Sequence, residues 1–180
     1  MSKQHKRLPH EIDPFRLCES GAELEGNIPL KQFKRLKPLL IEGSDDSGQV
    51  NIVLNFDIDE LGVPFVSGRI KTKLALICQR CLGTYEYPVD QEINLAWAKS
   101  EQEMKDLPLR IEPYLVETNP LATNDVIEDE LLLAIPQIPM HDKDKCSASN
   151  WVDKEPEQNT DDTTEKENPF AVLSKMKTKD

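Results

Sequence analysis

The sequence predicts an α+β protein: an antiparallel β meander or partly closed sheet with one main helix packed on it. Three consecutive segments between residues 51 and 97 alternate apolar and polar side chains, which is typical of half-buried strands. Residues 123–136 carry the start and stop signals of a helix, and the composition after residue 142 is acidic and polar. The chain is therefore expected to divide into an N-terminal segment 1–19, an α+β core domain 20–142, a disordered acidic linker 143–167 and a short C-terminal docking helix 168–180.

Before the meander, the stretch "GAELEGNIPLKQFKRLKPLL" predicts a short strand near Leu24 to Ile28, followed by a basic helical turn or irregular segment. Because clustered cations contact RNA phosphates, this segment is the best local candidate for an RNA contact. A solvated helix face explains the same charges and is the more common situation. The four cations are Lys31, Lys34, Arg35 and Lys37.

The meander follows in the segments "NIVLNFDI" (51–58), "VSGRIKTKLALIC" (66–78) and "YEYPVDQEINLAW" (85–97). Successive side chains of a strand point to opposite faces, so the alternation gives each segment one apolar and one polar face. Short connections predict antiparallel neighbours, with the second and third strands forming a hairpin around two cysteines. The side chains expected in the core include Ile52, Leu54, Ile70, Leu74, Ile93 and Leu95.

A basic row, Arg69, Lys71 and Lys73, lies on the polar face of the second segment. A row of this kind is able to track phosphates. In the predicted hairpin, however, it faces an acidic row on the third segment, and opposite charges across a ladder attract each other. We therefore favour paired charges over an RNA contact here. The acidic row is Glu86, Asp90 and Glu92.

The segment "TNDVIEDELLLAIP" predicts the main helix. Thr123 or Asn124 is a suitable N-cap, and Pro136 ends the helix. Acids in the first turns of a helix interact favourably with its dipole and add solubility, which is far more common for such residues than catalysis. The apolar face expected against the sheet is Ile127, Leu131, Ala134 and Ile135.

The net charge is −11, and the acidity is concentrated in the second half of the chain. Long-range repulsion disfavours broad electrostatic binding to nucleic acid and favours a basic protein partner. No apolar run is long enough to span a bilayer, and the basic start "MSKQHKRLPHEIDPF" is not followed by the apolar segment of a signal peptide. We therefore expect a cytoplasmic protein without a membrane contact.

Residues 168–177, "NPFAVLSKMK", predict a short helix, in which Asn168 is a good N-cap and Pro169 suits the first helical position. A short apolar helix after a long polar linker is typical of a docking peptide. Its binding groove belongs either to this protein or to a partner. The expected docking face is Phe170, Val172, Leu173 and Met176.

Cys78 and Cys81 form a C-x-x-C motif with three interpretations: a metal site, a redox pair or free thiols. A thioredoxin-like redox pair lies at a helix N-terminus, whereas this pair lies between two predicted strands. With the following Leu82 and Gly83, the pair resembles a zinc knuckle, a tight turn that a glycine helps to close. A knuckle supplies only half of a tetrahedral site.

The stretch "HDKDKC" offers His141 and Cys146 as the other half. Thiolate and imidazole ligands suit zinc, so the sequence predicts one structural zinc bound by Cys78, Cys81, His141 and Cys146. Free thiols and redox activity remain open as alternatives. Cys18 has no partner at a suitable spacing and is taken as an isolated thiol.

Four stretches together resemble a known family: "LPHEIDPFR", "CQRCLGTYEYPV", "EDELLLAIPQIPMHDKDKC" and "NPFAVLSKMK". In this order they are similar to the YceD family, the large ribosomal RNA subunit accumulation proteins of bacteria. The resemblance implies a small, cytoplasmic, noncatalytic ribosome-biogenesis factor needed for the synthesis, processing or stability of 23S ribosomal RNA. It also implies a ribosomal or ribosome-assembly protein, rRNA or both as partners, with no small-molecule substrate and no catalytic residues.

The alternative function is that of an enzyme that processes RNA or exchanges thiols. A nuclease needs a histidine pair or a cluster of acids that holds magnesium in a cleft. The three histidines, His5, His10 and His141, show no such spacing. The residues themselves thus also favour a binding factor.

Overall fold

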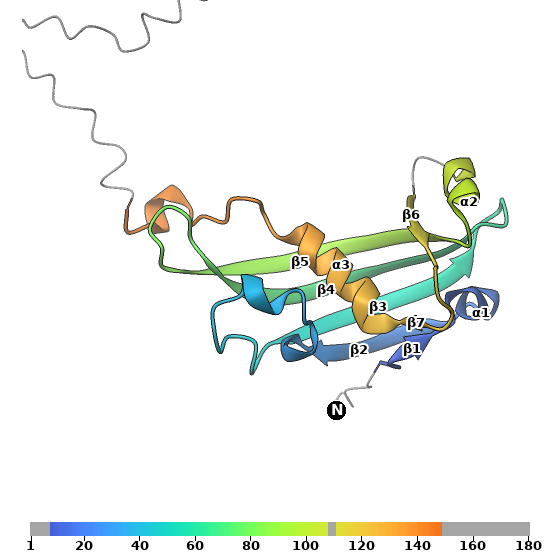
Figure 1. Ribbon diagram of the computed structural model, residues 1–180, viewed down its shortest axis with the longest axis horizontal. Coiled ribbons are helices and arrows are strands. Elements are labelled where there is room, and N and C mark those ends of the chain that lie inside the picture. The colour runs from blue at the N-terminus through green and yellow to red at the C-terminus, as the bar shows by residue number, and fades with distance from the viewer. Residues whose placement is uncertain (1–7, 108–110, 149–180) are drawn as a thin grey trace, which may run out of the picture. The chain divides into compact units, whose positions relative to one another are not determined.

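The computed structural model describes residues 8–107 and 111–148, and those up to Ser147 belong to one compact unit (Figure 1). The predicted C-terminal helix and the predicted linker beyond residue 148 lie outside the described residues. The strands are β1 (Glu11–Ile12), β2 (Glu23–Pro29), β3 (Gln49–Ile58), β4 (Pro64–Ile77), β5 (Thr84–Ala98), β6 (Glu112–Leu115) and β7 (Leu121–Ala122). The helices are α1 (Pro14–Glu19), α2 (Glu101–Asp106) and α3 (Thr123–Ala134), with 3-10 turns at Leu30–Gln32, Lys37–Leu39 and Lys143–Lys145.

The main sheet is open and has five strands in the order β2-β3-β4-β5-β6, while β1 pairs with β7 in a separate two-stranded sheet. Antiparallel pairing from β2 to β5 confirms the predicted meander and the strand expected near Leu24. β6, however, runs parallel to β5, so the sheet is mixed rather than wholly antiparallel. The connection through α2 allows the parallel return, and the four residues of β6 are too few to show an alternating pattern.

The inner face of the meander supplies most of the core. The six side chains predicted to be buried there, from Ile52 to Leu95, are each exposed by 3% or less. Phe56 of β3 and Trp97 of β5 stack on this face, with ring centroids 6.3 Å apart. The period-two pattern therefore identified the buried face correctly.

The outer face of the β4–β5 hairpin carries the predicted charge pairs. Lys71 Nζ lies 3.2 Å from an Asp90 carboxylate oxygen, and Lys73 Nζ lies 3.8 Å from Glu86. Arg69 contacts both Asp90 and Glu92. The pairing of the basic row with the acidic row is thus confirmed, and these cations already have carboxylate partners.

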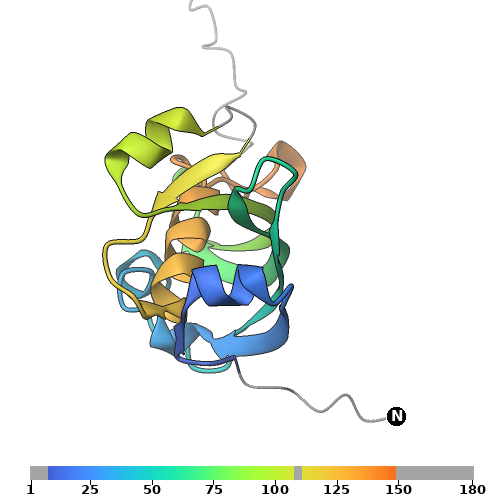
Figure 2. The ribbon, with the colours of Figure 1, turned by 90° about the vertical axis from the view of Figure 1, so that its right-hand side faces the viewer.

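α3 forms a layer over the sheet, as the two perpendicular views show (Figures 1 and 2). Its buried apolar residues are Val126, Ile127 and Leu131, and Ala134 and Ile135 pack at the edge of the core. Among the described residues, no helix combines the length and apolarity that a bilayer crossing requires. The predicted helix and its packing face are confirmed.

The start of α3 differs from the expected N-cap. The cap position is Ala122, which makes no side-chain cap bond, so the assignment of the cap to Thr123 or Asn124 is wrong. The chain passes directly from β7 into the helix, and the Thr123 hydroxyl donates instead to the Pro9 carbonyl oxygen at 2.7 Å. A tertiary hydrogen bond thereby uses the group that would cap the helix.

Two acids of α3 are buried rather than solvated. Glu128 and Glu130 are exposed by only 4% and 6%. The expectation that all acids of this helix serve its dipole and solubility is therefore wrong for this pair. The helix is covered on more than one side, so an acidic position in its sequence does not by itself mean a solvent-facing one.

Glu130 should make the folded state less stable as pH rises. Burial, with help from the neighbouring Glu112 and Asp129 carboxylates, raises the pKa of Glu130 from 4.5 to about 7. Between these two pH values the unfolded chain releases this proton while the folded chain retains it, so stability falls across that window. The free energy of unfolding of Glu130→Gln should therefore exceed that of the native chain by on the order of 2 kcal/mol at about pH 8. At about pH 4.5 the two values should be nearly equal.

Urea unfolding of both chains at the two pH values measures this difference. Other groups titrate alike in both chains, so their effects cancel in the comparison. Equal stability differences at both pH values would show that the pKa of Glu130 is not raised in the folded protein.

Candidate metal centre

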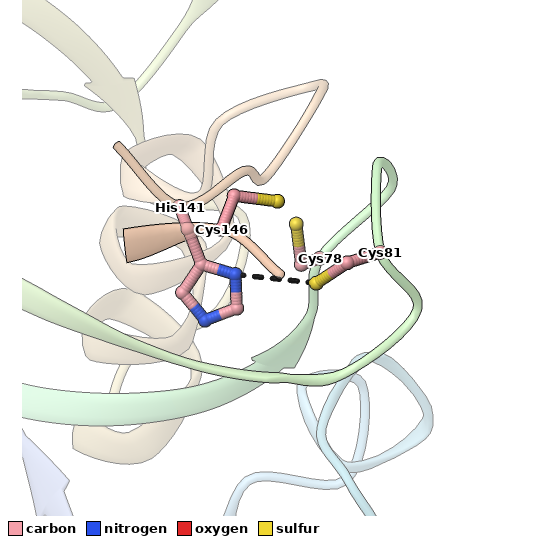
Figure 3. Close-up of side chains that lie close together, drawn as sticks. All are labelled: Cys78, Cys81, His141 and Cys146. Atoms are coloured by element: carbon pink, nitrogen blue, oxygen red, sulfur yellow. Dashed lines mark hydrogen bonds between the residues drawn. The ribbon is translucent and has the colours of Figure 1, made fainter. Parts of the chain in front are cut away.

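Four side chains converge at one end of the β4–β5 hairpin: Cys78, Cys81, His141 and Cys146 (Figure 3). Their candidate ligand atoms all lie within 4.8 Å of one another. Tetrahedral ligands that lie about 2.0 to 2.3 Å from zinc are roughly 3.3 to 3.8 Å apart, so a small inward rotation of the side chains completes such a site. The structure thus contains a Cys₃His cluster that is able to bind a metal.

The hairpin turn presents the first two thiols. Cys78 N–H donates to the Gly83 carbonyl at 2.9 Å, and Leu82 N–H donates to the Cys78 carbonyl at 2.8 Å. Leu82, not Gly83, adopts the left-handed conformation that closes the turn, with φ of 59°. The role expected for Gly83 is therefore wrong, and Leu82 holds a backbone conformation that side chains disfavour.

The segment after α3 presents the other two ligands. This segment passes along the hairpin turn, where Gln79 N–H donates to the Pro139 carbonyl at 2.9 Å and the Gln79 amide donates to the Gln137 carbonyl at 3.2 Å. Pro136 follows the C-cap residue Ile135 and has no N–H with which to continue the helix. These contacts bring together two cluster halves that lie about 60 residues apart in sequence.

The imidazole of His141 is oriented for metal binding through Nδ1. Its Nε2 lies 2.8 Å from the Thr84 carbonyl oxygen, to which it donates a hydrogen bond. This leaves Nδ1 to face the thiols, 3.5 Å from Cys81 Sγ. A carbonyl that fixes the second ring nitrogen is the usual support of a metal-binding histidine. The ring also packs edge-on against Tyr85, with centroids 5.2 Å apart.

The local electrostatics favour thiolates. Burial alone would raise the pKa of Cys78, but hydrogen bonds from the backbone groups of Cys81, His141 and Arg80 lower it to about 5. A hydrogen bond from the Gly83 backbone lowers the pKa of Cys81. The thiolate is the form of cysteine that binds metals. Backbone N–H groups directed at sulfur thus prepare the cluster for a cation.

Cys18 is separate from this cluster. It lies in α1, exposed by 2%, and its thiol donates to the Phe65 carbonyl at 3.3 Å. Burial raises the pKa of Cys18 to about 11, so its thiol stays protonated. The structure places it outside the metal-binding set, in agreement with its treatment as an isolated thiol.

The basic segment between β2 and β3 makes its ion pairs with residues outside the Cys₃His cluster. Arg35 is held by Glu128 at 3.1 Å and by Asp129 at 2.6 Å, and Lys37 lies 3.4 Å from buried Asp45. Lys31 and Lys34 are exposed and have no ion pair in the part of the chain that the structure describes. Half of the cations proposed to contact RNA are therefore already paired with acids.

The remaining predicted site residues, Phe170, Val172, Leu173 and Met176, lie outside the described residues. Sequence reasoning did not identify Thr84 and Gln79 as supports of the cluster. Thr84 acts through its carbonyl, which every residue type carries, so its identity gives no signal. For Gln79, the only sign of a supporting role in the sequence was its place as a polar residue between Cys78 and Cys81.

Two comparisons with known proteins point to the same family. A sequence profile described as "Large ribosomal RNA subunit accumulation protein YceD" matches residues 66–177. A curated protein of the same name from Haemophilus influenzae is 29% identical, over 98% of this chain and 99% of that protein. No solved structure matches significantly. Since the family profile spans more than half of the sequence, including the whole Cys₃His cluster, the chain belongs to the YceD family.

Proposed function

We propose that this protein supports the accumulation of large-subunit 23S ribosomal RNA as a noncatalytic ribosome-biogenesis factor of the bacterial cytoplasm. The observation that carries the proposal is the family match, together with a relative that aligns over almost its full length and is named for this role. The contribution to the RNA is in its synthesis, processing or stability. The C-terminal docking face predicted at residues 168–180 would provide a further contact with a partner.

The chemistry of the cluster supports a structural rather than a catalytic role. Three thiolates and one imidazole complete a tetrahedral zinc site, so no coordination position is left for a reactive water. We propose that one zinc ion binds Cys78, Cys81, His141 and Cys146. The ion would tie the hairpin end to the segment after α3, which otherwise meet through few hydrogen bonds.

The charge distribution supports a protein as the main partner. With a net charge of −11, the chain repels phosphate backbones at long range and attracts basic proteins. Ribosomal proteins are typically basic, which makes them suitable partners. Lys31 and Lys34 are the exposed cations of the basic segment that are left for a direct RNA contact.

A strain without this protein should contain less mature 23S rRNA relative to 16S rRNA. The ratio of 23S to 16S rRNA should return to its native value when the native gene is supplied on a plasmid. Pulse labelling with mapping of the rRNA ends would show whether synthesis, processing or decay changes. An unchanged ratio in the deletion strain would overturn the proposed function. Normal 16S levels serve as the internal control.

A further inference from the structure

Two adjoining hollows lie where β1, the β2–β3 connection and the start of α3 meet. Their volumes are about 360 Å³ and about 470 Å³, and they share His10, Gln32 and Asn124. The two hollows therefore adjoin along these residues, and we call them together the amide groove. We propose that the amide groove binds an extended, basic peptide segment of a protein partner.

Carboxamides at the centre of the groove match the chemistry of a peptide backbone. Asn124 Nδ2 donates to Gln32 Oε1 at 3.3 Å, which leaves Gln32 Nε2 as a donor and Asn124 Oδ1 as an acceptor. An amide side chain both donates and accepts hydrogen bonds, as a peptide group does. Gln49 adds a further amide to the first hollow. An extended peptide presents the alternating N–H and C=O groups that such a lining requires.

The first hollow also has an apolar wall, and the described residues that line it include no lysine, arginine, aspartate or glutamate. Leu8, Ile28 and Pro29 line it beside the amides and His10. A wall of this composition accepts an aliphatic side chain, while the amides hold the backbone on either side. Within the part of the chain that the structure describes, this lining has no lysine or arginine that would bind a phosphate group. The first hollow therefore fits an uncharged residue of a peptide.

The second hollow carries the charge that selects a basic residue. Glu11, Asp125 and Glu128 line it, together with Lys34 and Arg35. Arg35 is held by Glu128 and Asp129, so its charge is compensated within the protein. Glu11 and Asp125 are exposed and outnumber Lys34. A phosphodiester would meet these carboxylates, whereas a lysine or arginine side chain would be attracted to them.

The walls of the groove are fixed before a ligand binds. Thr123 N–H donates to the His10 carbonyl at 2.9 Å, and the Thr123 hydroxyl donates to the Pro9 carbonyl. On the opposite wall, Leu30 N–H donates to the Gly48 carbonyl at 2.9 Å, which anchors the turn that carries Gln32. A preformed groove loses little conformational entropy when it binds a peptide.

This inference deepens the proposed function. Peptide binding is argued from the groove itself, and only the identification of the partner as a ribosomal or assembly protein rests on the proposed function. The test uses the full-length protein and a fluorescein-labelled hexapeptide of alternating valine and arginine, with blocked ends, in a fluorescence anisotropy titration. We expect saturable binding that Asp125→Lys weakens by about tenfold. Gln32→Leu should weaken it as well, and this variant retains the charge of the native groove.

The matched control is Glu60→Lys, which makes the same charge change on the exposed turn between β3 and β4. This variant should bind the hexapeptide nearly as well as the native protein. Equal losses in Glu60→Lys and Asp125→Lys would overturn the proposal, because general charge attraction would then explain the binding. Absence of peptide binding, or preferential binding of a fluorescein-labelled hexauridylate, would also overturn it. None of these outcomes alters the rRNA ratio in the deletion strain, which tests the proposed function separately.

Discussion

Replacing Cys78 by serine is expected to abolish zinc binding and to lower the free energy of unfolding by several kcal/mol. The side chain is fully buried, and its sulfur is one of the four atoms that converge at the end of the hairpin. Structural zinc contributes on the order of 10 kcal/mol in small zinc-dependent domains, and a larger domain with its own core depends on the ion for part of that amount. Elemental analysis of protein purified without chelator, combined with denaturant unfolding, measures both effects.

Cys18→Ala is the matched control, because Cys18 is also buried but lies outside the cluster. It should retain one zinc ion per chain. A strong chelator should destabilise the native protein to the level of Cys78→Ser and should have no further effect on that variant. A native protein without zinc, or one that a chelator leaves unchanged, would contradict the metal site.

The sequence was sufficient to predict strands β2 to β5 but not β6, the strand at the other edge of the sheet. β3, β4 and β5 were predicted because a sheet with one solvated face places buried residues at every second position, as from Ile52 to Leu54 and from Ile70 to Leu74. β6 has four residues, one of them proline, and its pairing depends on where α2 directs the chain. Such a pairing is a property of the tertiary structure and leaves no periodic pattern.

The candidate metal centre was predictable from ligand chemistry, because cysteine and histidine at these spacings are the groups that zinc prefers. The supporting contacts were not predictable. Thr84 fixes His141 through a carbonyl, and Gln79 meets Pro139 through backbone groups, so their residue types carry no information about these contacts. The buried Glu128 was missed for a related reason: its partners lie more than 90 residues away in the sequence.

Glu128→Ala is expected to destabilise the protein by about 3 to 5 kcal/mol. One carboxylate oxygen accepts from the backbone N–H of Arg35 at 2.6 Å and from that of Leu36 at 2.9 Å, and the other accepts from Arg35 Nε at 3.1 Å. The side chain is only 5% exposed. Alanine would leave two backbone donors without their acceptor and would release the segment after β2 from α3. Denaturant unfolding of zinc-loaded protein measures the loss.

Two neighbouring variants separate the backbone bonds from the ion pair. Arg35→Ala removes the guanidinium but keeps the Arg35 N–H, so Glu128 retains both backbone donors and the expected loss is only about 1 to 2 kcal/mol. Asp129→Ala removes a partner of Arg35 whose side chain is 36% exposed, together with the acceptor of the Tyr114 hydroxyl, and should cost about 1 kcal/mol. If Arg35→Ala is as damaging as Glu128→Ala, the ion pair and not the backbone bonds joins this segment to α3. The predicted order of stability losses places Glu128 first, since a buried carboxylate that accepts from two backbone N–H groups cannot be replaced there by water.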